Sequence, residues 1–219
     1  MPRILFEKMG NAVWISHLDL MRLFQRAFKR AGLPLKHTQG FNPRPSVSIA
    51  LPLSVGVESR CELLDFELDT NELISNAQIV ARLNKALVDG VKVHECYDNG
   101  GKLRDLAYLH CQLSLEYDKG YGDACEGIRK LLAGESLIVP KKTKNGIQDQ
   151  DIIPMIKRCS VEQMNDNLVV LDLVVCCQNP TLNPMQIVEA IRMHGPEFMP
   201  DITTCCRLDL YDRQEAIFK

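Results

Sequence analysis

The chain has 219 residues, of which 46% are hydrophobic and 25% are charged, and its formal net charge is −2. This composition is typical of a soluble globular protein and excludes a collagen-like, low-complexity or largely disordered chain. No apolar run approaches the roughly 20 residues that a membrane-spanning helix needs, so we expect no membrane association. Met1–Ile4 leads directly into a strand-like segment, so we expect no secretory signal and a cytoplasmic location.

Strand and helix patterns alternate twice along the sequence. In the first half the predicted strands are 3–9, 46–53, 61–68 and 91–96, and the predicted helices are 17–31 and 76–88. In the second half the predicted strands are 107–117, 136–141, 168–177 and 203–211, and the predicted helices are 122–132 and 184–194. The order β-α-β-β-α-β therefore occurs twice. It predicts an α+β fold of two tandem ferredoxin-like (βαββαβ) domains.

The predicted domains are 1–97 and 106–219, because residues 98–105 are polar and glycine-bearing, as a linker is. The second domain carries a basic insertion, 141–157, between its middle strands. Its lysines would be explained by a solvated hairpin tip. The alternative is a mobile basic arm that contacts phosphates, with Lys142 and Lys144 as the predicted contacts.

The first predicted helix combines an apolar stripe with a basic face. Ser16 followed by Asp19 resembles a capping box at its start, and Gly32 ends it. Four cations share the face opposite the stripe: Arg22, Arg26, Lys29 and Arg30. A solvated helix face would explain them, but no Asp or Glu is interleaved among them to form ion pairs.

A loop with the sequence Gly-Phe-Asn-Pro-Arg-Pro, residues 40–45, follows this helix. Its prolines reduce the entropy lost on binding, and Gly40 permits backbone conformations closed to other residues. Residues 1–60 carry nine Lys/Arg against three Asp/Glu, which fits a localised anion-binding patch. The nucleic-acid-binding residues predicted in this patch are Arg22, Arg26, Lys29, Arg30, Gln39, Phe41, Asn42 and Arg44.

No catalytic, metal-binding or cofactor motif occurs in the sequence. The nine cysteines contain no C-x-x-C pair, so we predict buried free thiols, no metal site and no cofactor. His94 and Cys96 share a strand face, which is more often a structural arrangement than a metal pair. His17 and His37 are the only candidates for general acid–base work, and the helix between them is some 25 Å long.

Residues 6–10, 15–22, 26–27, 30–34 and 40–45 resemble the radical SAM-linked family of uncharacterised bacterial proteins, as do 53–59 and 144–152. The resemblance implies a stand-alone accessory domain of the kind found fused to or encoded beside a B12-binding-type radical SAM protein. It also implies a role in RNA or ribosome maturation. The chain lacks an arginine expected after Ile152, which weakens the expected anion-binding role of the second half.

Three functions follow from these observations. The first is a non-catalytic RNA-binding or substrate-presenting accessory protein, with RNA and a radical SAM protein as partners. The second is a protein-interaction subunit of a radical SAM enzyme without direct RNA contact. The third is an endoribonuclease or RNA-modifying enzyme that uses His17 or His37. A non-enzymatic role is favoured, because no second acid–base partner occurs at a defined spacing.

Overall fold

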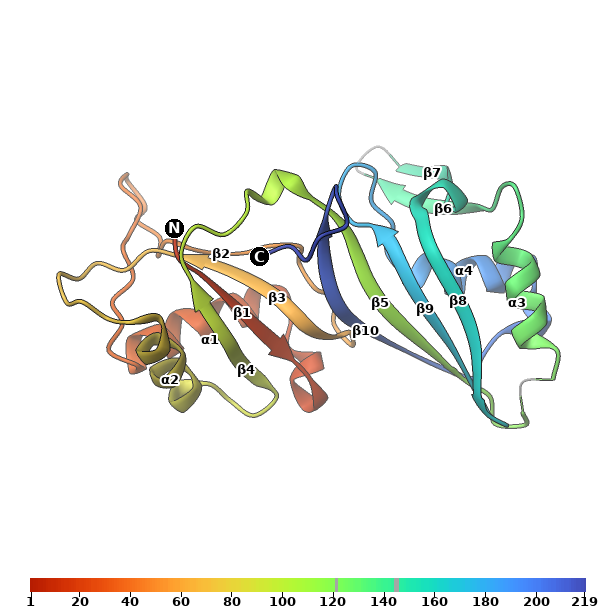
Figure 1. Ribbon diagram of the computed structural model, residues 1–219, viewed down its shortest axis with the longest axis horizontal. Helices are drawn as coiled ribbons and strands as arrows, with labels where there is room; N and C mark the ends of the chain where they lie inside the picture. The colour runs from red at the N-terminus through yellow and green to blue at the C-terminus, as the bar shows by residue number, and fades with distance from the viewer. Residues whose placement is uncertain (121, 144–145) are drawn as a thin grey trace. The chain divides into compact units, whose positions relative to one another are not determined.

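The computed structural model describes residues 1–120, 122–143 and 146–219, and it divides into two compact units. Unit 1 comprises residues 1–103 with Lys219, and unit 2 comprises residues 104–218. Both units combine helices with antiparallel strands (Figure 1), so the α+β class is confirmed. The division between the units falls inside the predicted linker, 98–105.

Unit 1 contains one antiparallel sheet in the order β4-β1-β3-β2. Its elements are β1 (Arg3–Lys8), η1 (Gly10–Trp14), α1 (His17–Arg30), β2 (Val47–Ile49), β3 (Glu58–Phe66), α2 (Asn76–Ala86) and β4 (Val91–Tyr97). Strand β2 is much shorter than the predicted strand 46–53. It ends because Leu51 has a φ of +46°, which is incompatible with an extended strand, and Pro52 has no amide hydrogen to donate.

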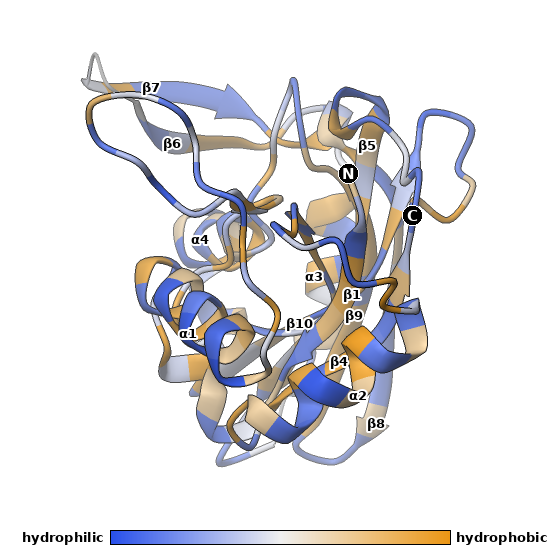
Figure 2. Ribbon diagram, turned by 90° about the vertical axis from the view of Figure 1, so that its left-hand side faces the viewer, coloured by the Kyte–Doolittle hydropathy of each residue, from blue (hydrophilic) through white to orange (hydrophobic). Residues whose placement is uncertain are grey.

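The apolar stripe of α1 forms part of the core of unit 1. Its buried residues are Leu20, Phe24, Ala27 and Phe28. The ring of Phe24 meets Phe6 of β1 edge-on, with centroids 4.7 Å apart, and Phe28 meets Phe66 of β3 at 4.9 Å. In Figure 2 the ribbon of α1 alternates between hydrophilic and hydrophobic segments, as an amphipathic helix does. Because the stripe is buried against the sheet, the basic face of α1 is left in solvent.

Local hydrogen bonds define both ends of α1. The Ser16 hydroxyl accepts from the Asp19 amide at 3.2 Å, which confirms Ser16 as the N-cap. At the other end Gly32 has a φ of +67°, and the amide of Leu33 donates to the carbonyl of Phe28 at 2.9 Å. This pattern is a Schellman motif, which ends the helix where the sequence predicts.

Replacing Gly32 by Ala is expected to destabilise the protein by about 1–2 kcal/mol. An added Cβ would meet nothing within 4 Å, so the cost is that of holding a side chain at positive φ. Urea unfolding followed by far-UV circular dichroism measures it. Gly134 follows helix α3 (Ala124–Leu132) at the same place but has no left-handed φ, so Gly134→Ala should change stability by less than about 0.5 kcal/mol. Equal costs for the two variants would contradict the conformational explanation.

Unit 2 contains an antiparallel sheet in the order β10-β5-β9-β8 and a separate two-stranded sheet, β6-β7. Its helices α3 and α4 lie on one side of the larger sheet (Figure 1). The elements are β5 (Leu106–Glu116), α3 (Ala124–Leu132), β6 (Ile138–Thr143), β7 (Gly146–Asp151), η3 (Ile153–Met155), β8 (Ile156–Asn165), β9 (Leu168–Cys176), α4 (Met185–His194), η4 (Pro196–Phe198) and β10 (Ile202–Asp212). A further short 3-10 helix, η2 (Leu103–Asp105), spans the boundary between the units.

The prediction for the middle strands of the second half is wrong in one respect. The strand predicted at 136–141 corresponds to β6, which pairs with β7 in the small sheet. The place predicted for it in the larger sheet, on the side of β9 away from β5, is taken by β8. Strand β8 has an almost wholly exposed burial pattern, with Val161 as its one buried residue. Its sequence therefore lacks the alternation of apolar and polar residues that predicts a strand, and its backbone ladder with β9 holds it in place.

The described helices include none that is both long enough and apolar enough to cross a membrane. All nine cysteines are free thiols, as predicted, and six of them are buried. Cys159 is exposed on β8, and Cys96 and Cys206 are partly exposed, so burial was predicted correctly for most of them.

Candidate nucleic-acid interface

The four predicted cations of α1 are all exposed, but they differ in their contacts. Arg22 pairs with Asp19, with Nη1 and Oδ1 3.0 Å apart. The guanidinium of Arg30 donates to the carbonyl of Ala86 at 2.6 Å. Among the residues that the structure describes, no carboxylate lies within ion-pair distance of Arg26 or Lys29, although the charge of Arg26 contributes to lowering the pKa of Asp19. Within the described residues, two of the four cations, Arg26 and Lys29, therefore form no ion pair.

The ion pair between Arg22 and Asp19 was not predicted, because Asp19 precedes the four cations and does not lie among them. A hydrogen bond from the Ser16 hydroxyl and then the Arg22 guanidinium hold the pKa of Asp19 below its ordinary value. Both side chains are largely exposed, and ion pairs in water contribute little because solvent screens them. A phosphate could therefore displace Asp19 from Arg22 at small cost.

Arg30 has a structural contact. Ala86 is the last residue of α2, and its carbonyl has no partner within that helix. By donating to this carbonyl, Arg30 links the end of α1 to the end of α2. Its guanidinium is consequently less available to a ligand than those of its neighbours.

The loop after α1 is a closed hairpin-like turn. The amide of Thr38 donates to the carbonyl of Arg44 at 2.8 Å, and the amide of Arg44 donates to the Thr38 hydroxyl at 3.0 Å. Gly40, with a φ of +144°, lies within this turn, and Phe41 beside it is fully exposed. The other predicted contacts in the loop, Gln39, Asn42 and Arg44, are exposed as well.

A cleft of about 440 Å³ joins the loop to the helix. Gln25 and Lys29 of α1 line one side, and His37 and Pro45 at the base of the loop line another. The rest of the lining comes from the mainly apolar segment 32–35. Lys29 and the loop therefore border one continuous surface, whose walls are apolar and whose rim carries a cation and an imidazole.

The two candidate catalytic histidines lie at opposite ends of α1. His17 is its first residue, whereas His37 shares the cleft with Lys29 near its C-terminal end. The fourteen residues of α1 span about 20 Å, so the two rings do not form an acid–base pair. The Nδ1 atom of His17 is buried and has no hydrogen-bond partner among the described residues.

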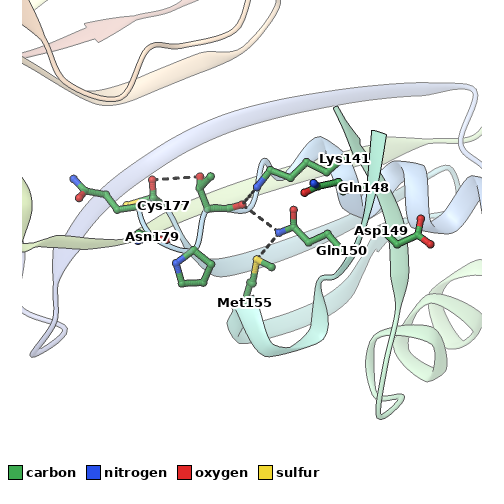
Figure 3. Close-up of a pocket in the computed structure, with 10 residues that line it drawn as sticks. Lys141, Gln148, Asp149, Gln150, Met155, Cys177 and Asn179 are labelled. Carbon is green, nitrogen blue, oxygen red and sulfur yellow. Dashed lines mark hydrogen bonds between the residues drawn. The ribbon is translucent and has the colours of Figure 1, made fainter. Parts of the chain in front are cut away.

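The basic insertion of unit 2 forms the β6–β7 hairpin, and the role of Lys142 and Lys144 in binding phosphates stays a prediction. Lys141 of β6 donates to the carbonyl of Thr181 at 3.1 Å, and Gln150 of β7 approaches the same carbonyl (Figure 3). The hairpin thus borders a cavity of about 540 Å³, and Asp149 also lines it. Lys142 is exposed, and the predicted contact Lys144 lies outside the described residues. The cavity is a poor anion site, because Lys141 already donates to a carbonyl and Asp149 carries a negative charge.

The described residues contain no group of three or more His, Cys, Asp or Glu that could hold a metal ion. His94 lies 3.0 Å from the carboxylate of Glu7, and the Cys96 thiol donates to the side-chain oxygen of Asn76. These separate partners agree with the structural interpretation of His94 and Cys96.

Unit 2 carries a second group of cations that was not predicted from the sequence. Arg104, Lys157 and Arg213 line one cavity of unit 2, together with the ring of Tyr108. They come from three separate parts of the chain, so no local spacing or charge run indicates them. Only the folded sheet brings them together.

Comparisons with known proteins identify a family and a fold. A family model described as "Uncharacterized protein conserved in bacteria (DUF2344)" matches residues 2–184. No curated protein matches the chain. The comparisons thus bear out the resemblance to an uncharacterised bacterial family, and none of them mentions a radical SAM protein, so that link stays a prediction.

Among solved structures, the chain matches the "Crystal Structure of a Cbf5-Nop10-Gar1 Complex" at 11% identity and a TM-score of 0.51, covering 94% of this chain and 47% of that chain. The "Structure of H/ACA RNP bound to a substrate RNA containing 2'-deoxyuridine" has 10% identity and a TM-score of 0.47, covering 94% and 46%. An unknown protein from Galdieria sulphuraria has 12% identity and a TM-score of 0.26, covering 96% of both chains. The chain spans about half the length of the first two. At 11% identity the likeness to the Cbf5-Nop10-Gar1 structure, which has a TM-score above 0.5, concerns the fold alone.

Proposed function

Since the chain belongs to the DUF2344 family of uncharacterized proteins conserved in bacteria, we propose that it serves there as a non-catalytic accessory protein that binds single-stranded RNA. The binding surface lies on unit 1 and is called the α1–loop surface. It consists of Arg22, Arg26 and Lys29, the cleft beside them, and the loop residues Gln39, Phe41, Asn42 and Arg44.

One observation carries this proposal. The ring of Phe41 is fully exposed at a loop closed by hydrogen bonds, and the loop borders the same cleft as the uncommitted Lys29. A large apolar ring held in water costs free energy, and no packing within the described residues compensates for it. A nucleobase can stack on such a ring, and nearby cations neutralise the adjoining phosphates.

The surface suits an unpaired strand better than a duplex. Bases in a duplex are stacked on one another, whereas those of a single strand can turn out and stack on an aromatic side chain. The cleft between Lys29 and His37 offers apolar walls of a size that accepts one such base. The cations of α1 lie along one helix face, as phosphates lie along an extended strand.

The tandem ferredoxin-like architecture is part of the proposal. The element order of unit 1 and the sheet orders β4-β1-β3-β2 and β10-β5-β9-β8 support it. A radical SAM enzyme as partner, and RNA or ribosome maturation as the process, are supported only by the sequence resemblance.

A second candidate function is protein docking without RNA. Trp14 and Leu18 are largely exposed near the start of α1, and Trp14 packs over Gly56, next to the exposed Val55. Exposed apolar side chains in one region are typical of protein interfaces. An enzymatic function using His17 or His37 has less support, because the two histidines lie at opposite ends of α1.

Replacing Phe41 by Ala is expected to weaken the binding of a single-stranded RNA, about 12 nucleotides long, by roughly 10-fold or more. The reason is the loss of base stacking, since the side chain makes no packing contact in the core. Fluorescence anisotropy with labelled RNA measures the affinity, and circular dichroism should show an unchanged fold.

Leu73 provides the matched control, because it is an almost equally exposed apolar residue elsewhere in unit 1. The variant Leu73→Ala should bind RNA as the wild type does. If Phe41→Ala and Leu73→Ala both retain wild-type affinity, Phe41 does not stack on RNA. Copurification of a stoichiometric protein, abolished by Trp14→Ala and unaccompanied by RNA, would instead favour protein docking.

A further inference from the structure

We infer that unit 2 contains a separate pocket for the terminal phosphate of a nucleotide. The pocket has a volume of about 470 Å³, and Arg104, Lys157 and Arg213 line it. These residues precede β5, begin β8 and follow β10, respectively. All lining residues belong to unit 2, so the site is distinct from the α1–loop surface and does not depend on it.

The charges of this pocket are not balanced by the protein. Its lining contains no carboxylate. Within 104–120, 122–143 and 146–218, no carboxylate forms an ion pair with Lys157 or Arg213. Arg104 approaches Asp105 at 3.9 Å, at the outer limit of an ion pair, and both side chains are largely exposed. Three like charges around one cavity repel each other, and a bound anion relieves that repulsion.

Lys157 and the loop that carries Asn179 are fixed by contacts within unit 2. The Lys157 ammonium lies 5.2 Å from the centre of the Tyr108 ring, a cation–π contact that keeps it at the pocket wall. The side-chain amide of Asn179 comes from the loop after β9. That loop is closed at its base by the amide of Leu182, which donates to the carbonyl of Cys176 at 2.9 Å. Guanidinium, ammonium and amide groups all donate hydrogen bonds, and such donors suit phosphate oxygens.

The size and charge of the pocket favour a terminal phosphate over an internal one. A phosphate monoester carries a charge of about −1.5 to −2 near neutral pH, whereas a phosphodiester carries only one negative charge. Three cations are therefore matched better by a monoester. The volume also accepts more than a bare phosphate ion, and small-ligand pockets of about this size are common. The phosphate could belong to a free nucleotide or to a phosphorylated RNA end, which share this chemistry.

Isothermal titration calorimetry of the full chain with adenosine 5′-monophosphate, and with adenosine as the matched ligand without phosphate, tests the inference. The nucleotide should bind and the nucleoside should not. Arg213→Gln and Lys157→Gln should each weaken nucleotide binding on the order of 10-fold, the effect of losing one charge-assisted hydrogen bond. Lys119→Gln removes an exposed lysine of unit 2 outside the pocket and should leave binding unchanged. Equal binding of nucleotide and nucleoside, or wild-type affinity in both pocket variants, would overturn the inference.

A second pair of ligands identifies the source of the phosphate. If an RNA with a 5′-phosphate binds more tightly than the same RNA with a 5′-hydroxyl, and Arg213→Gln removes the difference, the phosphate is that of an RNA end. If the two RNAs bind alike, and Arg213→Gln still weakens the binding of adenosine 5′-monophosphate, the ligand is a free nucleotide. Phe41→Ala weakens both RNAs equally if the α1–loop surface binds RNA, so failure of one site is distinguishable from failure of the other.

Discussion

Replacing Arg26 and Lys29 together by Gln is expected to weaken the binding of single-stranded RNA about 20-fold at about 0.1 M salt. Both side chains are exposed, and neither has a carboxylate partner among the described residues, so both are available to phosphates. Losing two phosphate contacts should also reduce the slope of log affinity against log salt by about 1.4. Anisotropy titrations between about 50 and 200 mM salt measure the affinity and the slope in one series.

The control for this variant is the double replacement Lys92→Gln and Lys102→Gln. It removes the same charge from exposed positions of unit 1 that lie outside α1 and its loop. If binding depended only on net charge, the two double variants would lose affinity equally. That outcome would contradict a defined α1–loop surface, and a salt slope unchanged in the α1 variant would contradict phosphate contact by these residues.

Replacing Phe24 by Ala is expected to destabilise the protein by about 3–5 kcal/mol. The side chain is fully buried, and its ring meets that of Phe6 edge-on at 4.7 Å. Its removal leaves a cavity between α1 and the sheet that the surrounding core cannot fill. Urea unfolding followed by circular dichroism measures the loss. Trp14 is the only tryptophan and lies in unit 1, so its fluorescence reports on that unit.

Phe24→Leu serves as the comparison, because it retains most of the buried volume and should cost only about 1.5 kcal/mol. Equal costs for the Ala and Leu variants would contradict the explanation from lost volume, because both variants remove the ring contact with Phe6 and only Ala leaves a large cavity. If Phe24→Ala leaves the stability unchanged, Phe24 does not hold α1 against the sheet. Helix α1 carries the proposed RNA contacts, so a variant that unfolds would lose RNA affinity for that reason alone. RNA affinity is therefore compared only among variants whose urea unfolding curve matches that of the wild type.

Local patterns predicted those elements whose signals lie within a few residues of one another. Helix α1 has its N-cap at Ser16, its stripe at helical spacing and its C-terminal Gly32, and all three act through contacts within the helix or the next turn. Strand β8 shows the opposite case. It has one buried residue, Val161, and its position depends on hydrogen bonds to β9. The sequence of β8 itself shows no alternation of apolar and polar residues that would predict these bonds.

The sequence by itself determined the α+β class, the limits of α1 and the basic face that it turns to solvent, because capping, helical periodicity and glycine conformation are local properties. The tertiary structure alone decided which cations are available. It paired Arg30 with the end of α2 and placed Lys29 beside the loop in one cleft. It also gathered Arg104, Lys157 and Arg213 around one pocket of unit 2. These contacts join residues far apart in the chain, and only the pairing of strands and the packing of helices bring such residues together.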